Sequence, residues 1–214
     1  LGEPPAQDSV LLRAGNGAGS NQSFPIKSSL FPAIDFSPAS PWAVATATGA
    51  RPEQRICVAR RAEALKADAK WRCIADFDDQ VQVSAVHGDT LYLLSVHGHP
   101  NGRLLAVDLA QAEAGLKDAR EIFAAADGEI LSGSATVPTV ASLAAARDAL
   151  YLRLARSGGD RFVRVDYRSG DTAPVALAHT GSATLFSADA GMDGFVVTLQ
   201  DWTTPPATYQ YLPG

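Results

Sequence analysis

Features that would point to a charged or lipid partner are scarce in this sequence. Lys and Arg number 18 against 23 Asp and Glu, so the net charge of −5 offers no broad attraction for a phosphate backbone or an anionic membrane. No apolar run approaches the roughly 18 to 20 residues that a membrane span requires. We therefore predict no nucleic acid and no membrane among the partners.

Targeting signals are also missing from the N-terminus. It has no basic segment followed by an apolar stretch, which is the pattern of a signal peptide. The chain begins with Leu1 rather than Met, which indicates a processed or excised piece. The localisation of the parent protein therefore stays unknown, with cytoplasm and periplasm both open.

Cysteine is scarce, with only Cys57 and Cys73 present. Two cysteines are too few for a disulfide framework or a thiolate zinc site. Each lies in a short apolar run typical of a β-strand, so a cross-strand disulfide is geometrically possible if the two strands are neighbours. Free cysteines are often buried, and we expect a pair of buried thiols rather than a disulfide.

The motifs of nucleophilic and nucleotide chemistry are absent as well. No Gly-x-Ser-x-Gly elbow occurs, and Gly133-Ser134 and Gly181-Ser182 lack its context, so we interpret both serines as loop residues. The glycine-rich run 15–19 matches neither a phosphate loop nor a dinucleotide fingerprint, and we predict a flexible surface loop there. We predict no catalytic and no cofactor-binding residue in this chain.

Two groups of potential metal ligands have a simpler interpretation. His97-Gly98-His99 offers two imidazoles, but no further ligand stands at a suitable spacing, so we predict an ordinary hairpin. Asp76, Asp78 and Asp79 lack the glycine and the distal glutamate of a calcium loop, and we predict a solvated connection. The sequence therefore predicts no metal site.

What the sequence does contain is a hydrophobic content of 46% and a repeated pattern. A β-rich run, a turn with Gly or Asp, a second run, a polar hairpin and a third run ending near Asp recur in order, with a fourth run in the more complete copies. The four copies cover approximately 30–75, 81–124, 139–178 and 184–214. Four strands per repeat joined by short hairpins are typical of a β-propeller blade.

Two details of the repeats support this interpretation. Leu104 and Ala106 alternate with Leu105 and Val107, so the strand is apolar on both faces, as in blades stacked face to face. Tyr92 and Tyr151 each follow a turn and lie in a Leu-Tyr-Leu run. We predict that they occupy equivalent positions on the second strands of successive blades.

Alanine-rich stretches favour a helical alternative, because alanine is the best helix former. These stretches are 39–48, 60–70, 110–120 and 141–156. We predict short helices only at 61–69 and 111–117, which lie between the third and fourth strands of a repeat. Over 142–154 the repeat register and the break at Arg147-Asp148 favour two strands.

Two stretches carry a family resemblance, which extends from about Ser29 onward. Residues 71–109 (WRCIADFDDQVQVSAVHGDTLYLLSVHGHPNGRLLAVDL) resemble the propeller domain of the prolyl oligopeptidase family of serine peptidases. They share with it a tryptophan-led outer strand, an aspartate-rich connection, a G-x-x-L-Y strand, an x-P-x-x-R-L hairpin and a strand ending in D-L. Residues 195–213 (FVVTLQDWTTPPATYQYLP) resemble the segment with which that propeller returns to the peptidase domain, with a Trp-Thr-x-Pro loop and a tyrosine-rich strand.

The resemblance implies an architecture and a function. It implies an all-β fold of about four four-stranded antiparallel blades, roughly half of a seven-bladed propeller, over 29–214, with 1–28 as a leading segment from a preceding blade. The chain would be the non-catalytic part of a prolyl-oligopeptidase-like peptidase. It would gate the access of short peptides to an α/β-hydrolase domain of the parent chain, which carries the catalytic triad. The alternative is a stand-alone propeller that serves as a binding scaffold, without a hydrolase.

Two further expectations follow from the resemblance. The family's propeller contributes an arginine and a cysteine to the substrate pocket from a hairpin that matches 46–55, where this sequence has Ala47 and Ala50. Cleavage after proline is therefore in doubt. Because four blades shaped for a seven-bladed ring leave two terminal sheet faces without neighbours, we expect apolar faces there and self-association through the terminal blades rather than marginal stability.

Overall fold

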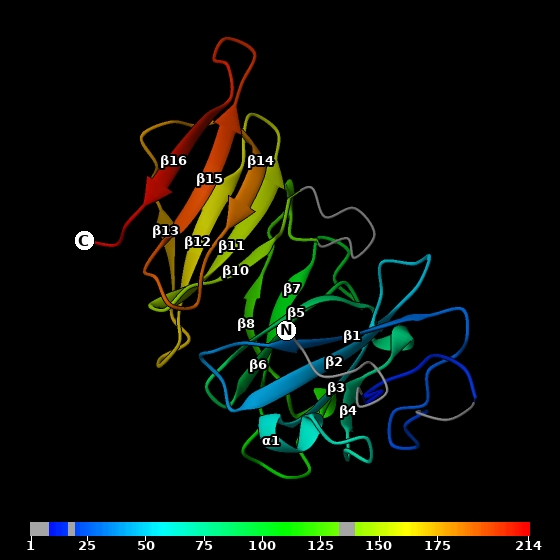
Figure 1. Cartoon of the computed structure of the whole chain (residues 1–214). Coiled ribbons are helices and arrows are strands. Elements are labelled where there is room, and N and C mark those ends of the chain that lie inside the picture. The colour runs from blue at the N-terminus through cyan, green and yellow to red at the C-terminus, as the bar shows by residue number, and fades with distance from the viewer. Residues whose placement is uncertain (1–8, 17–19, 133–139) are drawn as a thin grey trace, which may run out of the picture.

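The computed structural model of the chain describes residues 9–16, 20–132 and 140–214, and these contain four successive antiparallel sheets, which we call blades 1 to 4 (Figure 1). Blade 1 comprises β1 (Phe31–Phe36), β2 (Trp42–Thr48), β3 (Arg55–Arg60) and β4 (Arg72–Ala75). Blade 2 comprises β5 (Val81–His87), β6 (Thr90–Ser95), β7 (Arg103–Asp108) and β8 (Arg120–Ala124). Blade 3 comprises β10 (Leu143–Ala145), β11 (Ala149–Arg156), β12 (Arg161–Asp166) and β13 (Thr172–Val175), and β9 (Glu129–Ile130) pairs with β11. Blade 4 comprises β14 (Ser182–Ser187), β15 (Phe195–Gln200) and β16 (Ala207–Tyr211).

The all-β fold class is confirmed. Within each blade the strands pair in chain order, as expected for hairpin-connected repeats, and blade 4 has three strands among the described residues. The stretch 142–154 forms β10 and β11, so the strand interpretation was right there. None of the described helices is long and apolar enough to span a membrane.

The two tyrosines occupy equivalent places, as predicted. Tyr92 is the third residue of β6 and lies opposite Ala85 of β5. Tyr151 is the third residue of β11 and lies opposite Ala144 of β10. The alignment of the second and third repeats in the sequence therefore matches the alignment of their second strands in the structure.

The aspartates that end the third strands form the turns that follow. The carboxylate of Asp108 accepts a hydrogen bond from the backbone N–H of Ala110, and that of Asp166 accepts one from Arg168. Such side-chain bonds favour a turn over continued strand pairing. This local chemistry explains why the third run of both repeats stops at an aspartate.

The apolar cores lie between successive blades. Leu105 and Val107 pack toward blade 1, whereas Leu104 and Ala106 pack toward blade 3. A third core joins blades 3 and 4 around Phe195 and its neighbours. Both faces of a middle blade are therefore buried, as the two-sided apolar pattern predicted.

The predicted helices at 61–69 and 111–117 were largely wrong. The helix α1 covers only Arg61–Ala64, and no side chain caps its N-terminus. In the second stretch only a 3-10 turn, η3 (Leu116–Asp118), forms. The side-chain amide of Gln111 donates a hydrogen bond to the carboxylate of Asp108, and the extended backbone of Gly115 interrupts the segment. These turn contacts outweigh the helix propensity of alanine.

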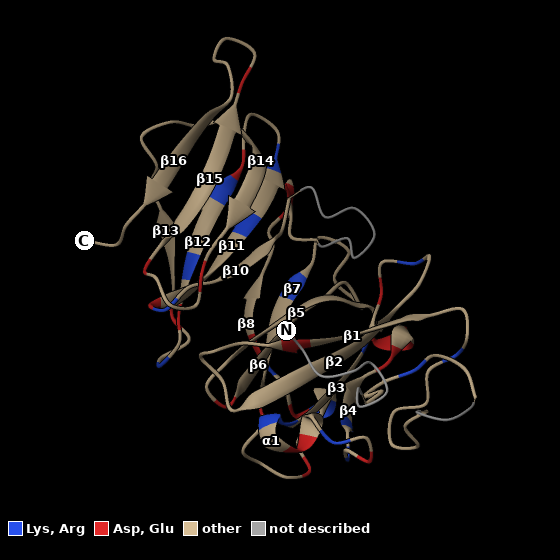
Figure 2. Cartoon of the chain, viewed as in Figure 1, with Lys and Arg blue, Asp and Glu red and all other residues tan. Residues whose placement is uncertain are grey.

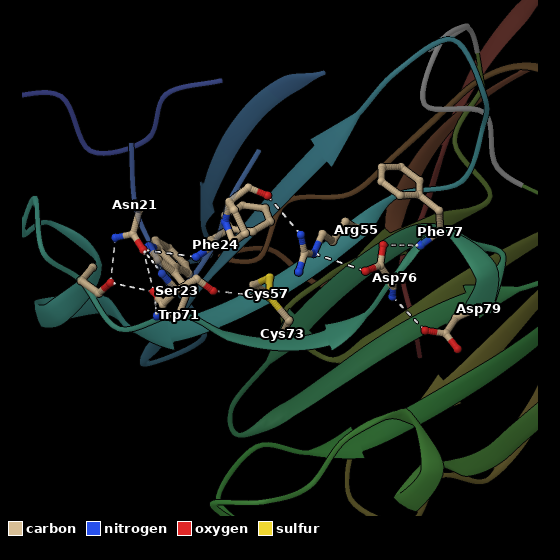
Figure 3. Close-up of a disulfide and its surroundings, with 12 residues drawn as sticks. Asn21, Ser23, Phe24, Arg55, Cys57, Trp71, Cys73, Asp76, Phe77 and Asp79 are labelled. Carbon is tan, nitrogen blue, oxygen red and sulfur yellow. Dashed lines mark hydrogen bonds and ion pairs between the residues drawn. A yellow bond between two sulfur atoms is a disulfide. The ribbon is translucent and has the colours of Figure 1, made fainter. Parts of the chain in front are cut away.

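The expected pair of thiols was also wrong. Cys57 on β3 and Cys73 on β4 are direct partners in the strand register, with Cα atoms 3.8 Å apart, and they form a disulfide (Figure 3). The register of two strands that are separated by a helix and a loop brought the sulfur atoms together. The sequence showed the two strands but not this register.

The outer face of blade 1 is covered by the segment that precedes β1. Phe24 and Ile26 of this segment are buried against the alanines of β2 and against Trp71. Asn21 fixes the segment, because its side chain donates to the carbonyl of Ala69 and accepts from the N–H of Ser23 (Figure 3). Of the predicted loop at 15–19, Gly15 bonds to Ile26 through its N–H, and residues 17–19 lie outside the described residues.

The expectation of two bare apolar faces was therefore wrong. The first face has a cover within the chain. On the outer face of blade 4, Leu185 and Val196 are exposed beside the polar Thr198, Thr208 and Gln210. Because threonine and glutamine hydrate readily, this face is mixed rather than apolar. Self-association stays a prediction.

Candidate functional site

The first strands of the four blades converge on one hollow. It has a volume of about 400 Å³ and is lined by residues of β1, β5, β10 and β14, which are the innermost strands of their sheets. Residues 37–38 and 188–190 of the adjoining turns, Val44 of β2 and Ala141 also belong to the lining. The hollow is thus the place where all four blades meet, as at the axis of a propeller.

Short side chains dominate the wall of this hollow. Representative lining residues are Ser84, Ala145 and Ser187, and the acidic members are Asp35 and Asp189. No Lys, Arg or His belongs to the described lining. A wall of small side chains leaves room for an extended polypeptide, and it presents no paired acid, base and nucleophile.

Each of the four histidines has a partner: an aromatic ring, a backbone carbonyl or a carboxylate. His87 stacks on Tyr167 with ring centroids 3.6 Å apart, and burial lowers its pKa. His97 bonds to the carbonyl of Asp78, and His99 lies 3.9 Å from the carboxylate of Glu121.

The fourth histidine, His179, lies with its Nε2 3.2 Å from the carboxylate of Asp201. None of these four contacts is to a serine hydroxyl or a cysteine thiol. His97 and His99 turn to separate partners, and the described residues hold no group of three His, Cys, Asp or Glu that could bind a metal ion.

Several other sequence predictions can be located. Gly133-Ser134 lies outside the described residues, and Ser182 is the first residue of β14 rather than a loop residue, because it pairs with Gln200. Asp76 caps the 3-10 turn η2 (Phe77–Asp79) between blades 1 and 2, which confirms a connection there. That no residue is catalytic stays a prediction.

The two alanines that the resemblance singled out lie away from the hollow. Ala47 is fully buried under the segment before β1, and Ala50 is exposed in the hairpin between β2 and β3. Neither belongs to the described lining of the hollow.

Sequence reasoning used the Trp-Thr-x-Pro loop only for the family resemblance and missed a second hollow that lies beside Trp202. A hollow of about 330 Å³ lies between the hairpins of blades 3 and 4, and Trp202 forms part of its wall. The signal was present in Asp-Trp-Thr-Thr-Pro-Pro, where a tryptophan stands among polar and proline residues with no apolar neighbour to bury it.

With this geometry established, comparisons with known proteins become informative. No family model matches the chain, and neither does any curated protein. A solved structure from a study of two prolyl endopeptidases is 20% identical with a TM-score of 0.67, and the match covers 85% of this chain and 25% of that one. Prolyl oligopeptidase B from Galerina marginata, without substrate and bound to a 35mer, is 16% identical with a TM-score of 0.67, covering 86% of this chain and 24% of that one.

These likenesses show the fold. The chain has the fold of part of a prolyl oligopeptidase propeller, so the resemblance read from the sequence is confirmed at that level. The chain spans about a quarter of the length of these solved structures.

Proposed function

We propose that this chain is the non-catalytic propeller portion of a prolyl-oligopeptidase-like serine peptidase, in which it gates the access of short peptides to a hydrolase domain. The observation that supports this best is the convergence of four first strands on a hollow lined by short side chains. An extended peptide fits such a space, whereas a folded domain does not.

The gate works by exclusion and needs no reacting group of its own. Apolar cores between successive blades hold the innermost strands in place, so the width of the hollow is set by rigid sheets. The purified chain should therefore show no turnover of a proline-containing peptide. Turnover that a serine-directed inhibitor abolishes would contradict this assignment.

The first test is the reading frame that encodes the chain. A Gly-x-Ser-x-Gly elbow downstream of Gly214 would support the peptidase assignment. Its absence from the whole reading frame would favour the alternative, a stand-alone propeller that binds peptides or proteins as a scaffold.

The second test narrows the hollow in the full-length protein. Ser187 is exposed in the hollow, and Ser187→Trp should slow hydrolysis of a peptide of twenty or so residues more than hydrolysis of a chromogenic dipeptide. Thr184→Trp is the matched control, because Thr184 is exposed on the same strand outside the described lining. Equal effects of the two substitutions on both substrates would refute gating through this hollow.

A further inference from the structure

A further hollow, which we call the segment hollow, lies between the segment that precedes β1 and the part of blade 1 around Arg55 and Asp76. It has a volume of about 810 Å³, against about 400 Å³ for the hollow where the four blades meet, and the two hollows share no described lining residue. Small-molecule sites in proteins are clefts of about 300 to 1,000 Å³. The segment hollow therefore has the size of a ligand site and is separate from the proposed gate.

The charges that line the segment hollow differ from those of the chain as a whole. The chain has 18 basic and 23 acidic residues, which are dispersed over the blades (Figure 2). The described lining of the segment hollow has two basic residues, Lys27 and Arg55, and one acidic residue, Asp76. The described lining of the hollow between the four blades has two acidic residues and no basic one. The segment hollow therefore favours an anion, whereas the other hollow does not.

Arg55 and Asp76 form an ion pair within the segment hollow. Arg55 Nε lies 3.6 Å from Asp76 Oδ2, and Asp76 Oδ1 accepts a hydrogen bond from the N–H of Phe77 (Figure 3). Arg55 Nη1 donates to the carbonyl of Pro25 at 3.0 Å, and Nη2 takes part in neither contact. Lys27 is exposed and has no hydrogen bond or ion pair to another described side chain. One positive charge, that of Lys27, therefore stays uncompensated.

Other residues of the lining offer apolar contacts. Ile26 is buried in the core of blade 1, and Leu30 and Phe77 are half-buried. Pro25 is exposed in the same lining. An apolar wall with a few polar groups that fix orientation is typical of a small-molecule site. The apolar part of a ligand would lose water contact against these side chains.

The wall formed by the segment is held in place without a ligand. The side chain of Asn21 donates to the carbonyl of Ala69, and the hydroxyl of Ser23 accepts from the N–H of Trp71 (Figure 3). Phe24 of the same segment is fully buried. Because this wall is already ordered, binding of a ligand costs little ordering of the chain.

We infer that the segment hollow binds a small carboxylic acid with an apolar body, whose carboxylate pairs with Lys27. A single carboxylate matches the one uncompensated positive charge, whereas a phosphate group carries about −1.5 to −2 and would also face Asp76. Arg55 Nη2 is a second donor in the same hollow, and Leu30 and Phe77 line the space for the apolar body. This site does not depend on the proposed function.

Saturation-transfer difference NMR tests the site with matched pairs of probes. The probes are the N-acetyl derivatives of phenylalanine, leucine and proline, each as the free acid and as the uncharged amide. At least one acid should bind this chain, and its amide should bind roughly tenfold more weakly because it lacks the charge-assisted hydrogen bond to Lys27. Equal binding of each acid and its amide, or no binding of any acid, would overturn the inference. Displacement of the acid by inorganic phosphate at lower concentration than by acetate would overturn the choice of a carboxylate.

Substitutions of Lys27 locate the binding. Lys27→Met should weaken binding of the acid roughly tenfold and leave that of the amide unchanged, and Lys27→Arg should keep the wild-type preference. Lys117→Met is the matched control, because Lys117 is exposed outside the described lining. Since the side chain of Lys27 has no partner in the described structure, its substitution should leave the melting temperature unchanged. Equal effects of Lys27→Met and Lys117→Met on binding of the acid would overturn the inference.

The same titration of the full-length protein shows whether the hollow is open there. The full-length protein should prefer the acid over the amide as this chain does. Loss of that preference would mean that additional polypeptide covers the hollow, which would overturn the inference. A reading frame without Gly-x-Ser-x-Gly would refute the proposed function and leave the binding of the acid unaffected.

Discussion

The indole N–H of Trp42 on β2 donates a 2.7 Å hydrogen bond to the carboxylate of Asp89, which lies in the turn between β5 and β6. This bond ties blade 1 to blade 2. Asp148 occupies the matching turn of blade 3 and accepts the N–H of Gly194 from blade 4. At two of the interfaces, an aspartate in the turn between the first and second strands of a blade thus accepts a hydrogen bond from a neighbouring blade.

Removal of the hydrogen bond between Trp42 and Asp89 should weaken the interface between blades 1 and 2. Asp89→Ala leaves the buried indole N–H of Trp42 without its partner, and we expect a loss of about 1 to 2 kcal/mol in the free energy of unfolding. Asp89→Asn keeps an oxygen acceptor and should cost less. Urea titration followed by tryptophan fluorescence measures both, and equal stabilities for Asp89→Ala and wild type would show that the bond contributes nothing.

The disulfide should stabilise the chain through its unfolded state. Cys57 and Cys73 are 16 residues apart, and closing a loop of about 15 residues is worth about 3 kcal/mol in the chain-entropy description. We expect the double variant Cys57→Ala with Cys73→Ser to melt well below wild type. Addition of a reductant should lower the melting temperature of wild type and leave that of the double variant unchanged. A wild-type melting temperature insensitive to full reduction would contradict this prediction.

Two glycines of one hairpin form a matched pair. Gly98 and Gly102 both have positive φ, at +67° and +88°, but a Cβ at Gly98 would meet nothing within 4 Å, whereas one at Gly102 would lie 1.7 Å from the carbonyl oxygen of Leu131. Gly98→Ala should therefore cost about 1 to 2 kcal/mol, the cost of the left-handed backbone alone.

Gly102→Ala must in addition displace the backbone at Leu131, whose side chain is buried in the core between blades 2 and 3. We expect a total cost of roughly 2 to 4 kcal/mol. Thermal unfolding by circular dichroism compares the two variants. Equal melting temperatures would mean that the contact with Leu131 relaxes freely.

The ion pair between Glu129 and Arg161 should make stability depend on pH. Two hydrogen bonds from Arg161, at 2.6 and 2.7 Å, lower the pKa of Glu129 below its ordinary value of 4.5. A carboxyl with a lowered folded-state pKa stabilises the fold above its unfolded pKa, and this contribution is lost as the pH falls through the folded value. Glu129→Gln should therefore be less stable than wild type at neutral pH and lose less stability below pH 4.5.

Glu113→Gln is the control, because Glu113 is exposed in the connection between β7 and β8. Its stability should follow the wild-type pH curve in denaturant titrations. The prediction fails if Glu129→Gln and wild type lose the same stability as the pH falls from 4.5 through the lowered folded-state pKa of Glu129.

The strand repeats were readable in the sequence because their causes are local. Two-sided apolar runs, turns at Gly88-Asp89 and the stop at Asp108 act over a few residues, and each marked a strand or a turn at its place. The helices were overestimated because their prediction rested on alanine content, which is also a local property. The path of the chain from the third to the fourth strand of a blade is not determined locally, so alanine content does not predict it.

Pairings across the chain could not be read in this way, because they depend on how separate elements meet. The register of β3 and β4 joined Cys57 to Cys73, and the segment before β1 covered blade 1 through Phe24. Strand composition limits which faces are apolar, but it does not say which element covers them. Only the packing of the blades buried Trp42 and left Trp202 in solvent, because burial is a property of neighbours that lie far apart in the sequence.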